Sequence, residues 1–419
     1  MAYNRKQRLN DNIKAIETAF ILDREQRTPT ARERLLLERY CGFGGLKCIL
    51  NPARELADAV HWAKSDLELF APTVELHRLI RENSKNESEY KQLMDSLKQS
   101  VLTAFYTPSA VTEALTDVLK EHQIIPGKVL EPSAGIGAFV DSVLDNNPKA
   151  DIMAFEKDLL TGKILRHLHP EQKVRIEGFE KIEKPFNDYF DLAISNIPFG
   201  DVAVFDPSYT AMKGMRALVT RRIHNYFFVK ALDTVRDGGL VAFITSQGVL
   251  NAKNNSAARF MMLYHADLVS AIRLPNNLFT ENANTEVGSD LIILQKNSQK
   301  ESLRGDDNLL DTVYNDENRI PTNNYFLEHP ERIIHTTAKL DTDPFGKPAM
   351  IYTHEDGVEG IAEDLRKMLH EDFKKNLNLN RYLGIEETKA EEVKEVEEIE
   401  KTERIKPPIE VKQNDTVLS

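Results

Sequence analysis

The sequence predicts an α/β protein with a doubly wound, mostly parallel sheet, preceded by a helical region. From residue 129 onward, short runs of β-branched and apolar residues mark seven candidate strands: Val129–Leu130, Ile152–Phe155, Val174–Ile176, Leu192–Ser195, Leu240–Thr245, Leu268–Ile272 and Leu291–Leu294. Helical patterns fall between several of them, near residues 138–146, 159–168 and 224–236. Such alternation is typical of a sheet covered by helices on both faces. No long helix separates the last two runs, so we expect them to form an antiparallel pair at one edge of the sheet.

Helical patterns dominate the first hundred residues. Thr30 and Glu33 form a capping box ahead of an apolar run, and the glycines of Gly42–Gly45 end that helix. Residues 355–383 also look helical, and residues 385–419 hold eleven acids and six bases, a net charge of −5. We therefore expect four regions: helices at 1–100, the α/β core at 101–298, a small C-terminal region at 299–384 and an acidic tail, read as disordered, at 385–419.

Composition excludes several classes of protein. The 419 residues carry a formal net charge of −12, which argues against a generally basic nucleic-acid-binding coat but not against a local basic patch. No apolar stretch is long enough to cross a bilayer, and the polar first residues do not resemble a signal peptide. Cys41 and Cys48 are too few for a disulfide framework, and their spacing matches no zinc pattern. We therefore expect a soluble, cytoplasmic protein without a metal site.

A glycine-containing turn follows the first candidate strand and opens a helix. Gly135 and Gly137 allow a ligand to approach the backbone closely, and the N–H groups of the helix start favour polar or anionic atoms. Glu131 ends the strand, where it can meet a positively charged amino group. Glu156 ends the next strand, where a ribose-binding acid lies in such folds. Because the dinucleotide fingerprint is not met, this arrangement favours S-adenosylmethionine over NAD; a tight turn without a ligand is the alternative.

Tyr106 and Thr107 precede another helical pattern. Thr107 is a suitable N-cap and Pro108 a suitable first helical residue. These residues either mark only a helix start or close over the methionine end of a cofactor.

A second loop, Asn196-Ile197-Pro198-Phe199, follows the fourth candidate strand, at the sheet edge where reactive groups gather in open α/β folds. The amino group of adenine is a poor nucleophile because its lone pair is delocalised into the ring. The side-chain oxygen of Asn196 and the carbonyl of Ile197 can accept its two N–H groups, which favours the pyramidal nitrogen of the transition state. Phe199 offers a ring on which a flipped base can stack. For this tetrapeptide alone, a buried Asn at a proline turn is the alternative.

The motifs FYTP, EPSAGIGAF, FEKD and NIPFG follow one another in this order along the chain. In this order and spacing they resemble the gamma-class N6-adenine DNA methyltransferases, over about residues 30–297. With GFGGL near the start and LPNNLF near the end, the chain is similar to methylase regions of bacterial mobile-element and phage proteins, often joined to a helicase. The resemblance implies the S-adenosylmethionine-dependent methyltransferase fold, that cofactor, and methylation of adenine N6 in DNA in a mobile-element, restriction–modification or anti-restriction setting.

The resemblance also assigns roles to residues. The expected cofactor-binding residues are Tyr106, Thr107, Glu131, Ser133, Gly135, Gly137, Glu156 and Phe179. The expected catalytic residues are Asn196, Ile197, Pro198 and Phe199. Phe279 matches the aromatic residue that contacts the flipped base from its other side, with a core phenylalanine as the alternative. Ile197 stands where the family usually has a proline, but only its backbone carbonyl is needed.

The segment between Asp206 and Asp233 contains no acid and carries a local charge of +5. It directly follows the second loop, so we expect Lys213, Arg216, Arg221 and Arg222 to hold DNA phosphates; a solvated face is the alternative. No large recognition domain is evident after residue 300. Either residues 299–384 form a small recognition region, or recognition is loose, or it is supplied by a separate specificity subunit. The sequence has no helicase phosphate loop, so a helicase would be a separate partner, and no membrane partner is expected.

Two other functions remain open at this stage. The same chemistry serves RNA or the planar amide of a protein glutamine. Alternatively, the chain is a catalytically silent relic of the fold that binds DNA or a partner.

Overall fold

The computed structural model describes residues 4–103, 106–212, 214–280, 286–303, 307–314, 319–343 and 346–385. The chain forms two compact units, Met1–Leu377 and Asn378–Ser419. In the second unit, Asn378 caps the short helix α16 (Leu379–Leu383) through a 2.9 Å hydrogen bond from the N–H of Arg381. Phe105, Lys213 and the acidic tail from residue 386 onward lie outside the described residues.

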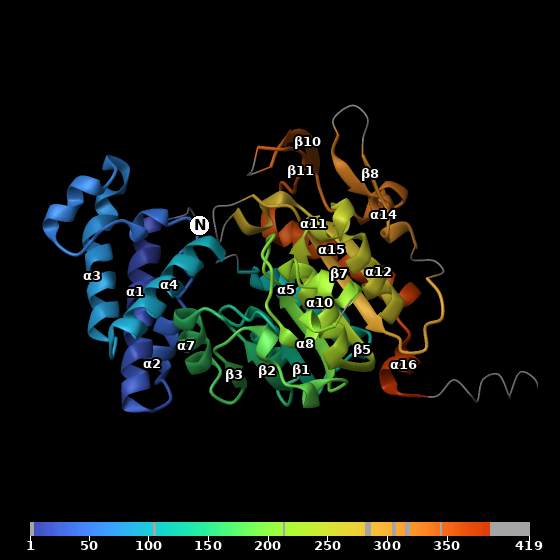
Figure 1. Ribbon diagram of the computed structural model, residues 1–419, viewed down its shortest axis with the longest axis horizontal. Helices are drawn as coiled ribbons and strands as arrows, with labels where there is room; N and C mark the ends of the chain where they lie inside the picture. The colour runs from blue at the N-terminus through green and yellow to red at the C-terminus, as the bar shows by residue number, and fades with distance from the viewer. Residues whose placement is uncertain are drawn as a thin grey trace, which may run out of the picture. The chain divides into compact units, whose positions relative to one another are not determined.

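A seven-stranded sheet forms the centre of the first unit (Figure 1). Its strands are β1 (Lys128–Glu131), β2 (Asp151–Phe155), β3 (Lys173–Arg175), β4 (Phe190–Asn196), β5 (Val235–Ser246), β6 (Ala266–Leu274) and β7 (Ser289–Lys296), in the order β3-β2-β1-β4-β5-β7-β6. All pairings are parallel except those of β7, which runs antiparallel to both β5 and β6. The predicted fold class, the seven strands and the antiparallel pair at one edge are thus confirmed.

Helices cover both faces of this sheet. Helices α10 (Ile223–Thr234) and α12 (Ser256–His265) pack on one face and share a buried aromatic and aliphatic core with the strands, including Ala271 of β6. Helices α5 (Ser109–Glu121), α6 (Ala138–Asn146) and α15 (Gly357–Asn376) pack together, and α15 contacts β6. Ser270 donates a 2.7 Å hydrogen bond to Asp372 of α15. Because successive residues of a strand point to opposite faces, α15 and α12 lie on opposite sides of β6.

Three N-terminal helices pack against α7 (Leu159–Leu168): α1 (Arg5–Glu25), α2 (Ala31–Leu37) and α4 (Glu87–Thr103). A fourth helix, α3 (Phe70–Glu82), packs on α1 and α4 (Figure 1). The capping box of Thr30 and Glu33 is confirmed at the start of α2. Leu160, Ile164 and Leu168 of α7 belong to the same buried cluster as the N-terminal helices. The helical region and the α/β core therefore share buried surface.

Shorter elements fill the connections. They are the hairpin strands β8 (Thr312–Tyr314), β9 (Pro321–Asn323), β10 (Thr337–Thr342) and β11 (Pro348–Thr353), the helices α8 (Pro207–Thr210), α9 (Met215–Val219), α11 (Gly248–Asn251) and α14 (Asn324–Glu328), and single 3-10 turns such as η4 (Phe179–Lys181) and η7 (Asn276–Phe279). Within the described part of the chain, no helix is both long and apolar enough to span a membrane.

Candidate active site

Three neighbouring strands bring the two predicted loops together at their carboxyl ends. Glu131 is the last residue of β1, Glu156 directly follows β2, and Asn196 is the last residue of β4. These strands are adjacent in the sheet. The hydroxyl of Ser195 donates a 3.3 Å hydrogen bond to the carbonyl of Ser133, so the loop after β1 is joined to the end of β4. Residues far apart in the sequence thus form one site at this edge.

Gly135 contacts both Tyr106 and Glu156. Its φ of +57° is the left-handed conformation that favours glycine, and its N–H donates a 2.8 Å hydrogen bond to Oε2 of Glu156. A Cβ on Gly135 would lie 2.9 Å from the ring of Tyr106. Any side chain here would therefore displace either Tyr106 or the loop.

Gly137 packs closely against the end of α7. Its N–H donates to the carbonyl of Ala134 at 2.8 Å, and a Cβ would lie 2.6 Å from Nε2 of His169 and 2.8 Å from Cδ1 of Leu165. The N–H of Ala134 likewise donates a hydrogen bond, to the carbonyl of Phe155 at 2.8 Å. Close packing against Leu165 and His169 therefore requires a glycine here, and a role of Gly137 in binding a cofactor stays a prediction.

Two buried carboxyl groups face this loop. Burial raises the pKa of Glu131 well above its usual range, and raises that of Glu156 to about 8 with a further contribution from the Asp158 carboxylate. Glu131 is 2% exposed, and its Oε2 has no hydrogen-bond partner among the described residues. A buried, unpaired carboxylate oxygen is costly unless a cation or donor meets it. The site therefore suits a ligand that brings a positive charge or a hydrogen-bond donor to this oxygen.

Thr107 does not cap the helix that follows. Helix α5 begins at Ser109 with Pro108 at the N-cap, and no side chain caps it. The predicted N-cap and first helical residue are thus both shifted by one position, because the fixed φ of proline suits the extended N-cap as well as the first turn. The Thr107 hydroxyl is buried and has no hydrogen-bond partner among the described residues.

The loop after β4 continues the pairing of the sheet. Ile197 donates its N–H to the carbonyl of Ile244 in β5 at 3.0 Å, and its side chain is buried. Pro198 and Phe199 remain partly exposed. The isoleucine therefore supplies a hydrogen bond that a proline at this position cannot make.

Phe199 and Phe279 lie side by side, although the sequence predicted only that they contact opposite sides of a flipped base. Their ring centroids are 6.1 Å apart with an interplanar angle of 77°, and Phe279 is fully buried in η7. In this edge-to-face arrangement the two rings touch each other, so a base stacked between them requires the rings to separate. Phe179, in contrast, packs in the core against Phe155 and Phe227, with ring centroids 5.8 and 5.3 Å away.

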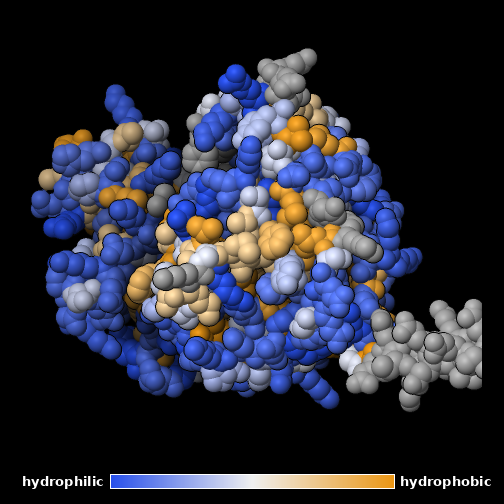
Figure 2. Space-filling view, turned by 45° about the vertical axis from the view of Figure 1, so that its right-hand side comes forward, coloured by the Kyte–Doolittle hydropathy of each residue, from blue (hydrophilic) through white to orange (hydrophobic). Residues whose placement is uncertain are grey.

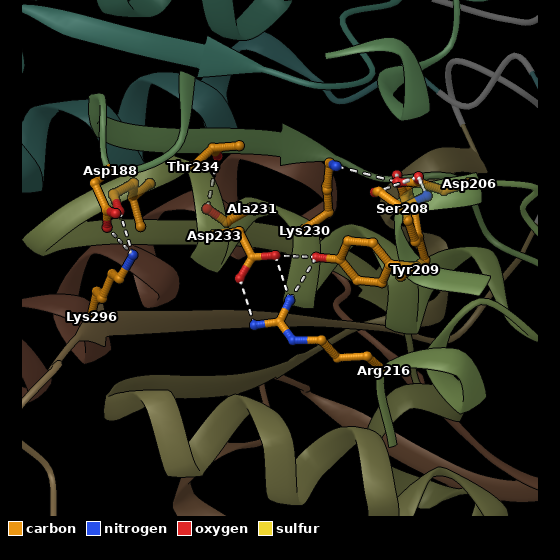
Figure 3. A network of polar contacts seen from close by, with 12 residues as sticks. Asp188, Asp206, Ser208, Tyr209, Arg216, Lys230, Ala231, Asp233, Thr234 and Lys296 are labelled. Atoms are coloured by element: carbon orange, nitrogen blue, oxygen red, sulfur yellow. Dashed lines mark hydrogen bonds and ion pairs between the residues drawn. The ribbon is translucent and has the colours of Figure 1, made fainter. Parts of the chain in front are cut away.

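Two acids neutralise much of the predicted basic segment (Figure 3). Asp233 accepts hydrogen bonds from both terminal nitrogens of Arg216, at 2.6 and 2.9 Å, and one from the hydroxyl of Tyr209. Asp206 accepts from Tyr226 at 2.7 Å and from Lys230 at 3.2 Å. The guanidinium of Arg216 is thus paired with Asp233, and the contact of Arg216 with DNA phosphate stays a prediction.

The two remaining predicted arginines border a cavity of about 360 Å³, together with Asn225, Asn254 and Asn255. Arg222 pairs with Asp201 at 2.9 Å and donates to Asn254 at 2.8 Å. Arg221 is exposed and makes no ion pair with another described residue. Among the described cations of this segment, Arg221 is therefore the one best placed to meet a phosphate.

Apolar side chains are also exposed in this segment and in the residues just before it. They include Val202, Phe205, Met212, Met215 and Leu218, each at least 40% exposed. Figure 2 shows a hydrophobic patch on an otherwise hydrophilic face of the molecule. The surface after the second loop is therefore mixed, not simply basic as its sequence indicates.

Asp158 is a site residue that the sequence reasoning left without a role. Its Oδ1 accepts the N–H of Thr161 at 2.7 Å and so caps α7, while its own N–H donates to Oε1 of Glu156 at 2.7 Å. An aspartate just before an apolar helical pattern is an N-cap signal and was available in the sequence. Its contact with Glu156 could not be predicted from the sequence.

Comparison with known proteins identifies the family. The "Defense against restriction protein B" of Escherichia phage P1 is 29% identical over 201 residues, which make up 46% of this chain and 8% of that protein. The "Type II methyltransferase M.XamI" of Xanthomonas campestris pv. amaranthicola is 25% identical over 173 residues, 38% of this chain and 33% of that protein. The chain thus spans a third or less of the length of these curated relatives.

Among solved structures, the methyltransferase subunit of a type I restriction-modification system from Streptococcus thermophilus aligns with 70% of this chain and 80% of its own, at 13% identity and a TM-score of 0.40. The model of the family described as "N-6 DNA Methylase" matches residues 88–391. Because this match covers well over half of its residues, the chain belongs to the N-6 DNA methylase family.

Proposed function

We propose that this protein transfers a methyl group from S-adenosylmethionine to N6 of a flipped adenine in DNA. The observation that carries the proposal is the joining of the two loops: Asn196 ends β4 beside the glycine loop, and the Ser195–Ser133 hydrogen bond ties the loops together. A methyl donor and an amine acceptor must lie within reach of one another for transfer.

The residues of the first loop fit the proposed cofactor. Oε2 of Glu131 is a buried carboxylate oxygen without a partner among the described residues, and it suits the positively charged amino group of a methionine moiety. Glu156 is held by the N–H groups of Gly135 and Asp158 and suits two ribose hydroxyls. When bound, the cofactor supplies a methyl group activated by its sulfonium centre.

The residues of the second loop fit the proposed substrate. The side-chain oxygen of Asn196 and the carbonyl of Ile197 can each accept one N–H of the adenine amine. This pairing stabilises a pyramidal nitrogen more than a planar one and so lowers the barrier to attack. Phe199 would stack on the base, with Phe279 on its other side once the rings separate.

DNA as the substrate is supported by membership of the family and by the exposed Arg221 after the second loop. The printed names of the two relatives, a phage restriction-defence protein and a type II methyltransferase, support a mobile-element or restriction–modification setting. In such a setting the chain would act in the cytoplasm, together with a separate helicase or specificity subunit.

The test is modification-sensitive sequencing of DNA from a methylation-free host that expresses either the wild-type chain or Asn196→Ala. We expect N6-methyladenine at a defined sequence with the wild type. Loss of the amide should lower the rate by about 10²–10³-fold, the cost of removing one transition-state hydrogen bond in other enzymes. Binding of S-adenosylhomocysteine to Asn196→Ala should be unchanged.

Other outcomes would replace the proposal. Labelled methyl groups found only on RNA or on protein glutamine would reassign the substrate. If the wild-type chain neither methylates DNA nor binds S-adenosylhomocysteine, it is a catalytically silent member of the family.

A further inference from the structure

Three hydroxyl groups link the N-terminal helical region to the glycine loop. The hydroxyl of Tyr40 lies 3.2 Å from Oγ1 of Thr161, in the first turn of α7. The same Oγ1 lies 3.4 Å from the hydroxyl of Tyr106. Tyr106 in turn places its ring against Gly135. Tyr40 is 1% exposed, so this line of contacts is shielded from water.

A second link runs through Ser96 of α4. Its hydroxyl donates a 2.7 Å hydrogen bond to Oδ2 of Asp158 and accepts the N–H of Leu160 at 2.9 Å. Asp158 donates its N–H to Glu156, whose other oxygen accepts the N–H of Gly135. The helical region therefore reaches the loop by two routes, one ending at Tyr106 and one at Glu156. The two routes are joined by the hydrogen bond from the N–H of Thr161 to Asp158 at 2.7 Å.

The glycine motif that follows Tyr40 holds this side chain in place. Asn12 of α1 donates to the carbonyl of Gly42 at 2.6 Å and accepts the N–H of Cys41 at 2.9 Å. Gly42 has a φ of +66°, which allows the tight turn. Phe43 packs edge-to-face on Tyr40, with ring centroids 6.1 Å apart. The motif has no chemistry of its own, but it fixes where the Tyr40 hydroxyl lies.

We infer that Tyr40 and Ser96 are positioning residues for the cofactor site, which makes the N-terminal helical region a working part of that site. This inference rests on the proposed function. Tyr40 restrains Tyr106 through Thr161, and Ser96 restrains Glu156 through Asp158. A side chain already fixed in its binding geometry loses less entropy when the ligand binds, so removing either hydroxyl should weaken binding without removing a direct contact.

The experiment compares Tyr40→Phe and Ser96→Ala with the wild-type full chain by calorimetric titration with S-adenosylhomocysteine. Tyr40→Phe keeps the ring that packs on Phe43. We expect each variant to bind about fivefold more weakly, the equivalent of one lost hydrogen bond. The double variant should bind about 25-fold more weakly if the two routes are independent. The matched control is Tyr90→Phe, in the same helical region, whose ring lies 4.1 Å from the guanidinium carbon of Arg81.

The unfolding temperature separates positioning from a loss of fold. We expect Ser96→Thr, which keeps the hydroxyl, to restore affinity, and every variant to remain folded at the titration temperature. If Tyr40→Phe and Ser96→Ala bind like the wild type while unfolding at a lower temperature, their role is only structural and the inference is overturned. If the wild-type chain itself binds no cofactor, the proposed function fails and the inference falls with it.

Discussion

At position 197 this chain has a backbone N–H where the resemblance drawn from the sequence leads us to expect a proline. Ile197 donates that N–H to Ile244 at 3.0 Å, next to the proposed catalytic amide of Asn196. We expect Ile197→Pro to destabilise the protein by about 1–3 kcal/mol, because it leaves the carbonyl of Ile244 without its partner. Urea denaturation measures this change.

Ile197→Val is the matched control, because it keeps the N–H and removes only one methylene. It should cost about 0.5–1.5 kcal/mol. Equal stability of Ile197→Pro and the wild type would mean that the loop gains as much from the ring of proline as it loses with the hydrogen bond.

Glu156 gives a second prediction at the scale of a residue. Burial raises its pKa from 4.5 to about 8, so the folded protein holds a proton that the unfolded chain releases. Its contribution to stability is therefore fully present below about pH 4.5 and is lost as the pH rises through about 8. Ribose hydroxyls would donate to the ionised carboxylate, so cofactor binding should release this proton.

We accordingly expect the affinity for S-adenosylhomocysteine to rise by up to about tenfold per pH unit as the pH increases toward 8. Titrations in buffers of different ionisation enthalpy measure the released proton. Glu156→Gln should bind weakly with little dependence on pH. An affinity that stays constant from about pH 6 to 8 in the wild type would assign the ribose to another group.

At the scale of elements, the segment with α8 and α9 contains two kinds of arginine. Arg216 is bidentate on Asp233, whereas Arg221 is exposed and makes no ion pair with another described residue. We expect Arg221→Ala to weaken DNA binding and to reduce the slope of log affinity against log salt by about one. Arg216→Ala should instead lower stability by about 1–3 kcal/mol with little effect on that slope. Filter binding at several salt concentrations, together with thermal unfolding, distinguishes them.

The sequence predicted the strands and loops well, but it did not predict which side chains contact one another. Strands such as β4 are revealed by local runs of apolar residues, and the loops at their ends follow from the topology of the fold. The charge of the basic segment was counted between Asp206 and Asp233, and the sequence did not show that those two acids pair with Lys230 and Arg216. Likewise, the contact of Gly137 with His169 depends on long-range packing. Side-chain partners brought together by folding leave no pattern along the chain.

For the whole molecule, the shared core of the N-terminal helices and α7 predicts how the chain can be divided. The family model begins at residue 88, which leaves out α1 to α3. Leu160, Ile164 and Leu168 of α7 are buried in that cluster, and Asp23 of α1 pairs with Arg166 at 3.1 Å. Burying each such side chain contributes about 1.5–3 kcal/mol, against a typical total stability of about 5–15 kcal/mol.

We therefore expect a fragment of residues 88–391 to unfold at a much lower temperature than the full chain, or to aggregate, although it contains every proposed catalytic and cofactor-binding residue. Ile164→Ala in the full chain should reproduce part of this loss, about 2–5 kcal/mol, and Ile164→Val much less. Scanning calorimetry measures each transition. If the fragment unfolds cooperatively at the temperature of the full chain, the family domain is autonomous and the N-terminal helices are a separate module. We expect instead that the fragment is unstable, because the apolar face of α7 is buried only when the N-terminal helices cover it.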